Sequence, residues 1–92
     1  MKRHVGSEED RTVIPENVSV FKSPGWVKRS ITYLLEREMA KQHITRAELA
    51  RRMETSRAVV NRLLDPEHLS LTLHTLEKAA EALGKELIID LR

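Results

Sequence analysis

The sequence contains no cysteine, and aromatic side chains make up only 3% of its 92 residues. Without cysteine the chain forms neither a disulfide nor a thiolate metal site, which agrees with a reducing compartment. The scarcity of aromatic rings argues against a protein that binds single-stranded nucleic acid by stacking bases. There is no apolar run of membrane-spanning length and no apolar core of a secretory signal. We therefore expect a cytoplasmic protein without a membrane partner.

The residue patterns of an enzyme or a metal protein are also missing. The chain has no nucleophile–base set, no paired-carboxylate pattern and no glycine-rich phosphate loop. Its histidines are scattered and lack the i, i+4 spacing of a metal site: His4, His43, His68 and His74. We expect no catalytic residue, no metal and no cofactor.

Charge is distributed unevenly, although the formal net charge is only +2. Residues 22–62 contain ten Lys or Arg and four Asp or Glu, a balance of +6. Residues 63–92 contain three basic and six acidic residues, a balance of −3. A basic half followed by an acidic half is typical of a protein that binds a polyanion.

The chain divides into three parts. Residues 1–22 show no helical period and are expected to form a flexible arm. Residues 23–84 carry helical apolar spacing, and residues 85–92 alternate as a strand does. A chain of this length has a modest core, so a dimer partner is plausible.

Two helices flank the centre of the helical part. Ser23 as N-cap and Pro24 at the first helical position predict the start of one helix. Its expected apolar face is Val27, Ile31, Leu34, Leu35 and Met39, and its expected outward side chains are Lys28, Arg29, Glu36 and Arg37. Thr72 predicts the cap of a later helix that ends at Gly84. Its expected buried stripe is Leu73, Leu76, Ala79, Ala80 and Leu83.

Between them, residues 45–64 read as two short amphipathic helices joined by a tight turn. Thr45 can cap the first helix, with Glu48 completing a capping box, and Ser56 can cap the second. Asp65 and Pro66 end the second helix. Each helix is too short to be stable alone, so both must pack on their neighbours. Their outward side chains are mostly basic: Arg46, Arg51, Arg52, Arg57, Asn61 and Arg62. Two such helices indicate a helix-turn-helix that recognises DNA.

The last eight residues, KELIIDLR, predict a β-strand. A single strand leaves its backbone groups unpaired, so the same strand of a second copy is the simplest partner. The alternatives are pairing with residues 18–21, a helix extension, or a strand packed on its own subunit. The predicted dimerisation residues are Leu87, Ile88, Ile89 and Leu91.

The sequence of residues 45–63, TRAELARRMETSRAVVNRL, resembles the lambda-repressor-like (Cro/CI, XRE) helix-turn-helix family in spacing, capping and apolar positions. The resemblance extends from Trp26 to Gly84. It differs at the turn, where Glu54 replaces the usual Gly, and at Arg46, where the family usually has Gln. A residue other than Gly in the left-handed conformation costs about 1 kcal/mol or somewhat more.

The resemblance implies a mainly α fold, a DNA-binding domain of four to five helices with a C-terminal β-strand that pairs across a homodimer. It also implies that the helix from Ser56 to Leu64 lies in the major groove. Arg57 is the best candidate to read guanine, Asn61 fits adenine, and Ala58 fits a thymine methyl. Arg62 would contact a base or a phosphate. The predicted DNA contacts are Arg46, Ser56, Arg57, Ala58, Asn61, Arg62, His68 and Ser70. Ser56 has a simpler explanation as a cap, His68 as a surface residue, and Arg51 and Arg52 as a solvated face.

The function that follows is a sequence-specific repressor of the bacterial cytosol or nucleoid that binds a palindromic double-stranded operator. In architecture, with a compact repressor fold, short flanking arms and a C-terminal strand, the chain resembles antitoxins of the HipB and HigA groups, and in HipB a strand pairs across the dimer. This resemblance implies the antitoxin of a type II toxin–antitoxin pair that autoregulates its operon. One alternative is a stand-alone or prophage Cro/CI-type regulator. Another is a protein-interaction module with weak DNA binding, whose arm of residues 1–22 folds on a toxin.

Overall fold

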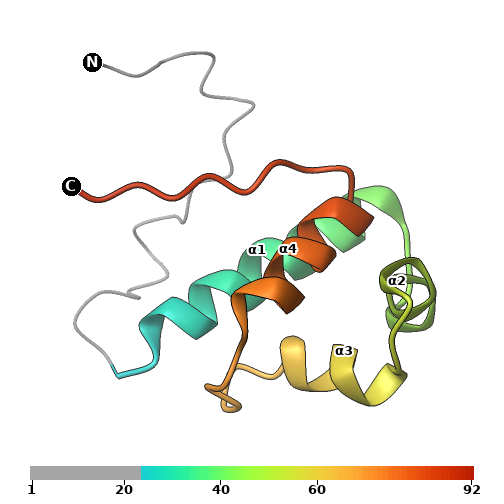
Figure 1. The fold of residues 1–92 in the computed structure, drawn as a ribbon, viewed down its shortest axis with the longest axis horizontal. Coiled ribbons are helices and arrows are strands. Elements are labelled where there is room, and N and C mark those ends of the chain that lie inside the picture. Colours follow the sequence, from blue (N-terminus) through green and yellow to red (C-terminus); the bar gives the residue numbers. More distant parts are fainter. Residues whose placement is uncertain (1–23) are drawn as a thin grey trace.

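The computed structural model describes residues 24–92, and this part of the chain contains four helices (Figure 1). They are α1 (Trp26–Gln42), α2 (Arg46–Met53), α3 (Arg57–Leu63) and α4 (Leu73–Ala82). Figure 1 draws α1 behind α4, with α2 at one end of the pair and α3 along the lower edge of the view. The predicted mainly helical architecture is confirmed. The arm of residues 1–22 and the Ser23 cap lie outside the described residues.

The helix α1 begins later than the sequence predicted. Gly25 occupies the N-cap position with φ 74° and ψ 13°, a left-handed conformation that glycine adopts without a steric penalty. Pro24 therefore precedes the helix and is not its first residue, so this prediction was wrong. The carbonyl of Gly25 accepts the first helical hydrogen bond from Arg29, at 3.1 Å.

The buried face of α1 is also rotated from the predicted one. Leu35 and Met39 are buried as expected, but Val27 is 50% exposed. Lys28 and Thr32 complete the buried stripe instead, since residues 28, 32, 35 and 39 share one helical face. The prediction that Lys28 faces outward was therefore wrong.

The three predicted caps of α2, α3 and α4 are confirmed. The hydroxyl of Thr45 accepts a hydrogen bond from the backbone N–H of Glu48 at 3.1 Å. The Ser56 hydroxyl accepts one from Val59 at 3.2 Å, and the Thr72 hydroxyl accepts one from Thr75 at 3.1 Å. Each such cap typically stabilises a helix by about 1 kcal/mol. This matters here because α3 has only seven residues.

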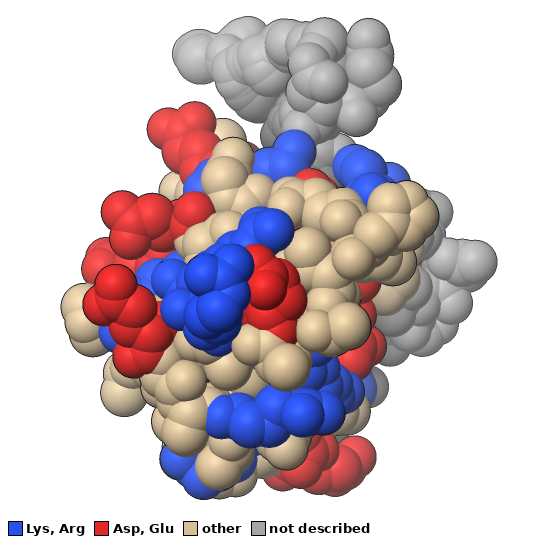
Figure 2. All heavy atoms as spheres, turned by 90° about the vertical axis from the view of Figure 1, so that its right-hand side faces the viewer, with Lys and Arg blue, Asp and Glu red and all other residues tan. Residues whose placement is uncertain are grey.

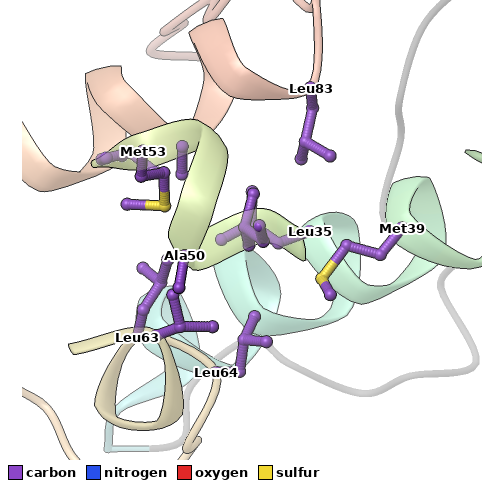
Figure 3. Packing of buried hydrophobic residues seen from close by; sticks show 11 residues of the cluster. Leu35, Met39, Ala50, Met53, Leu63, Leu64 and Leu83 are labelled. Carbon is purple, nitrogen blue, oxygen red and sulfur yellow. The ribbon is translucent and has the colours of Figure 1, made fainter. Parts of the chain in front are cut away.

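The core forms where the four helices meet (Figure 3). Leu49 of α2, Val60 of α3 and Leu64 just after α3 are its largest fully buried side chains. Leu35 and Met39 of α1 point toward the same centre. The side chains that hold α2 against α3 therefore also hold both helices against the rest of the domain.

The turn between α2 and α3 contains a left-handed residue, as the family resemblance predicted. Glu54 has φ 57° and ψ 47°. Its N–H donates to the Arg51 carbonyl at 3.1 Å, and the Thr55 N–H donates to the Ala50 carbonyl at 3.0 Å. This pair of bonds is the Schellman motif that ends helices with a left-handed residue. The same pattern follows α4, where Gly84 has φ 68°.

The tail after Gly84 forms no strand within the described chain. The alternative prediction that the tail extends the preceding helix is wrong, since α4 ends at Ala82. Three of the four predicted dimerisation residues are strongly exposed: Ile88 at 76%, Ile89 at 75% and Leu91 at 94%, with Leu87 at 40%. Pairing of this segment across a dimer stays a prediction, and pairing with residues 18–21 lies outside the described residues.

Replacing Glu54 by glycine is expected to stabilise the protein by about 0.5–1 kcal/mol. The substitution removes a left-handed penalty of about 1–2 kcal/mol, and the added freedom of the unfolded chain offsets about 0.4–1 kcal/mol of that gain. Urea denaturation should show a higher midpoint with an unchanged slope. Glu54→Ala is the matched control, because it removes the same side chain but keeps a Cβ. Equal midpoints for the two variants would contradict the prediction.

Candidate nucleic-acid interface

The helix α3 presents its polar side to solvent and its apolar side to the core. Val60 and Leu63 are buried, whereas Arg57, Ala58, Asn61 and Arg62 are exposed. The structure thus gathers these four predicted contact residues on one outer surface. Because Ser56 caps the helix and α2 packs against it, the surface has a defined position relative to the domain.

Arg46 lies next to this surface and links three helices. Its guanidinium donates to Asn61 Oδ1 at 3.1 Å and to Glu36 Oε2 at 3.2 Å. The structure therefore brings two predicted contact residues, Arg46 and Asn61, into direct contact across the two helices. With its oxygen engaged by Arg46, the Asn61 amide keeps its N–H donors available for a ligand.

Arg51 and Arg52 are held by a single carboxylate. Glu48 accepts from Arg51 Nε at 3.1 Å and from Arg52 Nε at 2.8 Å. The Arg51 hydrogen bonds, followed by those of Arg52, lower the pKa of Glu48 to about 2, so this carboxylate stays ionised at neutral pH. These pairs agree with the interpretation of Arg51 and Arg52 as a solvated face.

Arg57 and Arg62 differ from the other arginines of this unit. Across residues 24–92, no hydrogen bond or ion pair engages either guanidinium. Figure 2 shows Lys and Arg in two main groups on this face, one mixed with acidic residues and one across the lower part, at the level of α3 in Figure 1. An exposed guanidinium without a carboxylate partner is available for phosphate or a base edge.

The loop after α3 carries the last two predicted contacts. His68 is half-buried and Ser70 is exposed. The His68 N–H donates to the Asp65 carbonyl at 3.1 Å, and the Glu67 N–H donates to Asp65 Oδ1 at 2.9 Å. The structure places both residues beyond the end of α3, on a loop closed by its own hydrogen bonds.

Sequence reasoning missed Lys28, whose side chain reaches the end of α3 from α1. Lys28 is only 4% exposed. Its ammonium donates to the carbonyls of Arg62 at 3.0 Å, Asp65 at 2.8 Å, and His68. Burial lowers the pKa of Lys28, and the charge of Asp65 partly opposes that effect. The spacing of Lys28 from Thr32, Leu35 and Met39 was the signal that could have placed it on the buried face.

The described part of the chain meets the requirements of neither a metal site nor a membrane-spanning helix. It has no group of three His, Cys, Asp or Glu residues arranged to hold a metal ion. Among its helices, none has the length and apolarity needed to cross a membrane.

Comparison with known proteins agrees with this geometry. Residues 35–87 match the family described as the Cro/C1-type HTH DNA-binding domain. That range contains α2, α3 and α4 and the second half of α1. No curated protein and no solved structure gave a significant match. The chain belongs to the Cro/C1-type helix-turn-helix family of DNA-binding transcription regulators.

Proposed function

We propose that this protein is a sequence-specific repressor that inserts α3 into the major groove of double-stranded DNA. The observation that carries the proposal is the exposed surface of α3, where Arg57 and Arg62 lack any partner among residues 24–92. The helix dipole favours a basic residue in the last turn, such as Arg62, but disfavours one in the first turn, so folding alone does not explain Arg57. Guanidinium groups pair bidentately with the O6 and N7 atoms of guanine, which makes them suited to base readout.

The individual contacts follow from position. Arg57 is the first residue of α3, the end that meets base edges in this docking mode. Ala58 offers a methyl group to thymine, and Arg62 reads a second base or holds a phosphate. Asn61 would then contact a base or the backbone through its free N–H donors. Arg46, Ser56, His68 and Ser70 surround this surface and are proposed to contact phosphates, which set register and affinity.

A homodimer is part of the proposal because one recognition helix reads only a few base pairs. Two half-sites about one helical turn apart, ~34 Å, would match two copies of α3 related by a twofold axis. The support for pairing through residues 85–92 is the exposure of the apolar side chains of Ile88, Ile89 and Leu91. Paired tails would set the spacing of the two recognition helices.

An antitoxin role is also proposed, and its support is the resemblance of the domain and tail to the HipB and HigA groups. Such a protein would repress its own operon and neutralise a cognate toxin. One competing proposal is a stand-alone or prophage regulator without a toxin. The other is a toxin-binding module with weak DNA binding.

Arg57→Ala is expected to weaken operator binding by about 1–3 kcal/mol, the value of one bidentate guanine contact. Fluorescence anisotropy with a duplex selected by the wild-type protein measures this loss. Arg51→Ala is the control of equal charge change, and we expect a smaller and sequence-independent effect because Glu48 already pairs with Arg51. Wild-type affinity should fall steeply with salt. Equal losses for the two variants on selected and random DNA would contradict base readout by Arg57.

Deleting residues 86–92 is expected to convert the dimer into a monomer in sedimentation velocity experiments. The truncated domain should keep its helical circular dichroism, because no residue beyond Leu83 belongs to the buried core. Asp90→Ala is the control within the tail and should remain dimeric. A truncated chain that stays a tight dimer would rule out pairing through this segment.

If the antitoxin role is correct, co-expression with the product of the adjacent open reading frame yields a stable complex. Size-exclusion chromatography of the purified pair checks this expectation. Arg57→Ala should leave the complex intact, because Arg57 is proposed to read bases, whereas a toxin is proposed to bind residues 1–22. A neighbouring product that neither binds nor inhibits growth would favour the stand-alone regulator.

A further inference from the structure

The Lys28 ammonium is bound by three backbone carbonyls. An ammonium group has three N–H donors and no acceptor. In this protein the acceptors are the carbonyl oxygens of Arg62, Asp65 and His68. Every donor of the ammonium is therefore used, and the side chain is 4% exposed. A buried charge persists where its hydrogen bonds are complete.

These three carbonyls belong to the last turn of α3 and to the loop that connects α3 to α4. Arg62 lies in the last turn of α3, where carbonyl groups lack helical partners and the helix dipole favours a positive charge. Asp65 and His68 lie in the following loop. One ammonium thus fixes both the end of the recognition helix and the first part of the loop to α1.

Two of the three acceptor residues carry proposed DNA contacts. Arg62 is exposed while its carbonyl accepts from Lys28. His68 is half-buried, and its carbonyl also accepts from Lys28. Any displacement of these carbonyls would move both side chains relative to Arg57 at the other end of α3.

We propose that Lys28 is a positioning residue of the DNA interface, which holds the C-terminal end of α3 and the loop of residues 65–68 in the orientation that specific binding requires. This inference rests on the proposed function. Lys28 does not contact DNA itself, since its donors are all engaged and its side chain is buried. Its effect on affinity is therefore indirect and acts through the side chains of Arg62 and His68, which it positions.

The alternative is that Lys28 only stabilises the domain. Replacing it by Met keeps the length and the apolar stem but removes the ammonium from all three carbonyls; those of Arg62 and Asp65 still accept from the backbone N–H groups of Asp65 and His68. Such a variant would be less stable under either explanation, so stability alone does not separate them. The control must lose similar stability without touching the end of α3. Met39→Ala serves this purpose, because Met39 is a buried residue of the same helix, 6% exposed, and its side chain packs in the core.

The experiment uses the full chain with a duplex that the wild-type protein selects from a random pool, and with an unrelated duplex of equal length. Affinities are measured for Lys28→Met and Met39→Ala at a temperature at which circular dichroism shows each to be folded. We expect Lys28→Met to lose at least tenfold in affinity for the selected duplex and less than twofold for the unrelated one. Met39→Ala should lose less than threefold for both.

Equal losses for Lys28→Met and Met39→Ala would overturn the inference, and so would equal losses of Lys28→Met for the selected and the unrelated duplex. If Lys28→Met fails to fold, Lys28→Gln takes its place, because its amide still donates two hydrogen bonds; the same two outcomes decide. Failure of the proposed function has a different signature: the wild-type protein would select no sequence from the pool.

Discussion

The left-handed turn at Glu54 determines where the recognition helix lies. With φ 57° at this residue and the two hydrogen bonds that close the Schellman motif, α2 ends and the chain is redirected toward Ser56, which caps α3. Helices of eight and seven residues have little stability of their own, so their positions come from this turn and from the buried side chains of Leu49, Val60 and Leu64. The surface formed by α3 is a consequence of both.

Around that surface the basic residues have three distinct environments. Arg51 and Arg52 are exposed and share the Glu48 carboxylate, which compensates one of their two charges. Lys28 is buried and satisfied by carbonyls. Arg57 and Arg62 have no partner within residues 24–92, which leaves their charge uncompensated. A net charge of only +2 therefore conceals a local excess where α3 meets solvent.

Local signals in the sequence were sufficient for the presence of the four helices and for the caps of α2, α3 and α4, because each depends on residues within one or two turns of chain. The left-handed turn at Glu54 was predicted from the family resemblance. Contacts between distant residues were not predictable in this way. Apolar spacing alone favoured Val27 as a core residue, whereas the buried stripe of α1 includes Lys28, whose partners lie 34 to 40 residues away. The contact between Arg46 and Asn61 likewise depends on the packing of α2 on α3. Which exposed residues contact DNA depends also on the DNA itself, which the protein sequence does not describe.

The exposed tail follows from the closure of the core. Leu83 is the last buried side chain, and Gly84, with φ 68°, turns the chain away from α4 (Figure 1). Leu87 lies beside residues of α4 and is 40% exposed, whereas Ile88, Ile89 and Leu91 are at least 75% exposed. Covering these exposed apolar side chains with a second strand would lower the free energy of the protein. Because this segment contributes nothing to the core that positions α3, two copies can pair through it while Arg57 and Arg62 keep their places within each copy.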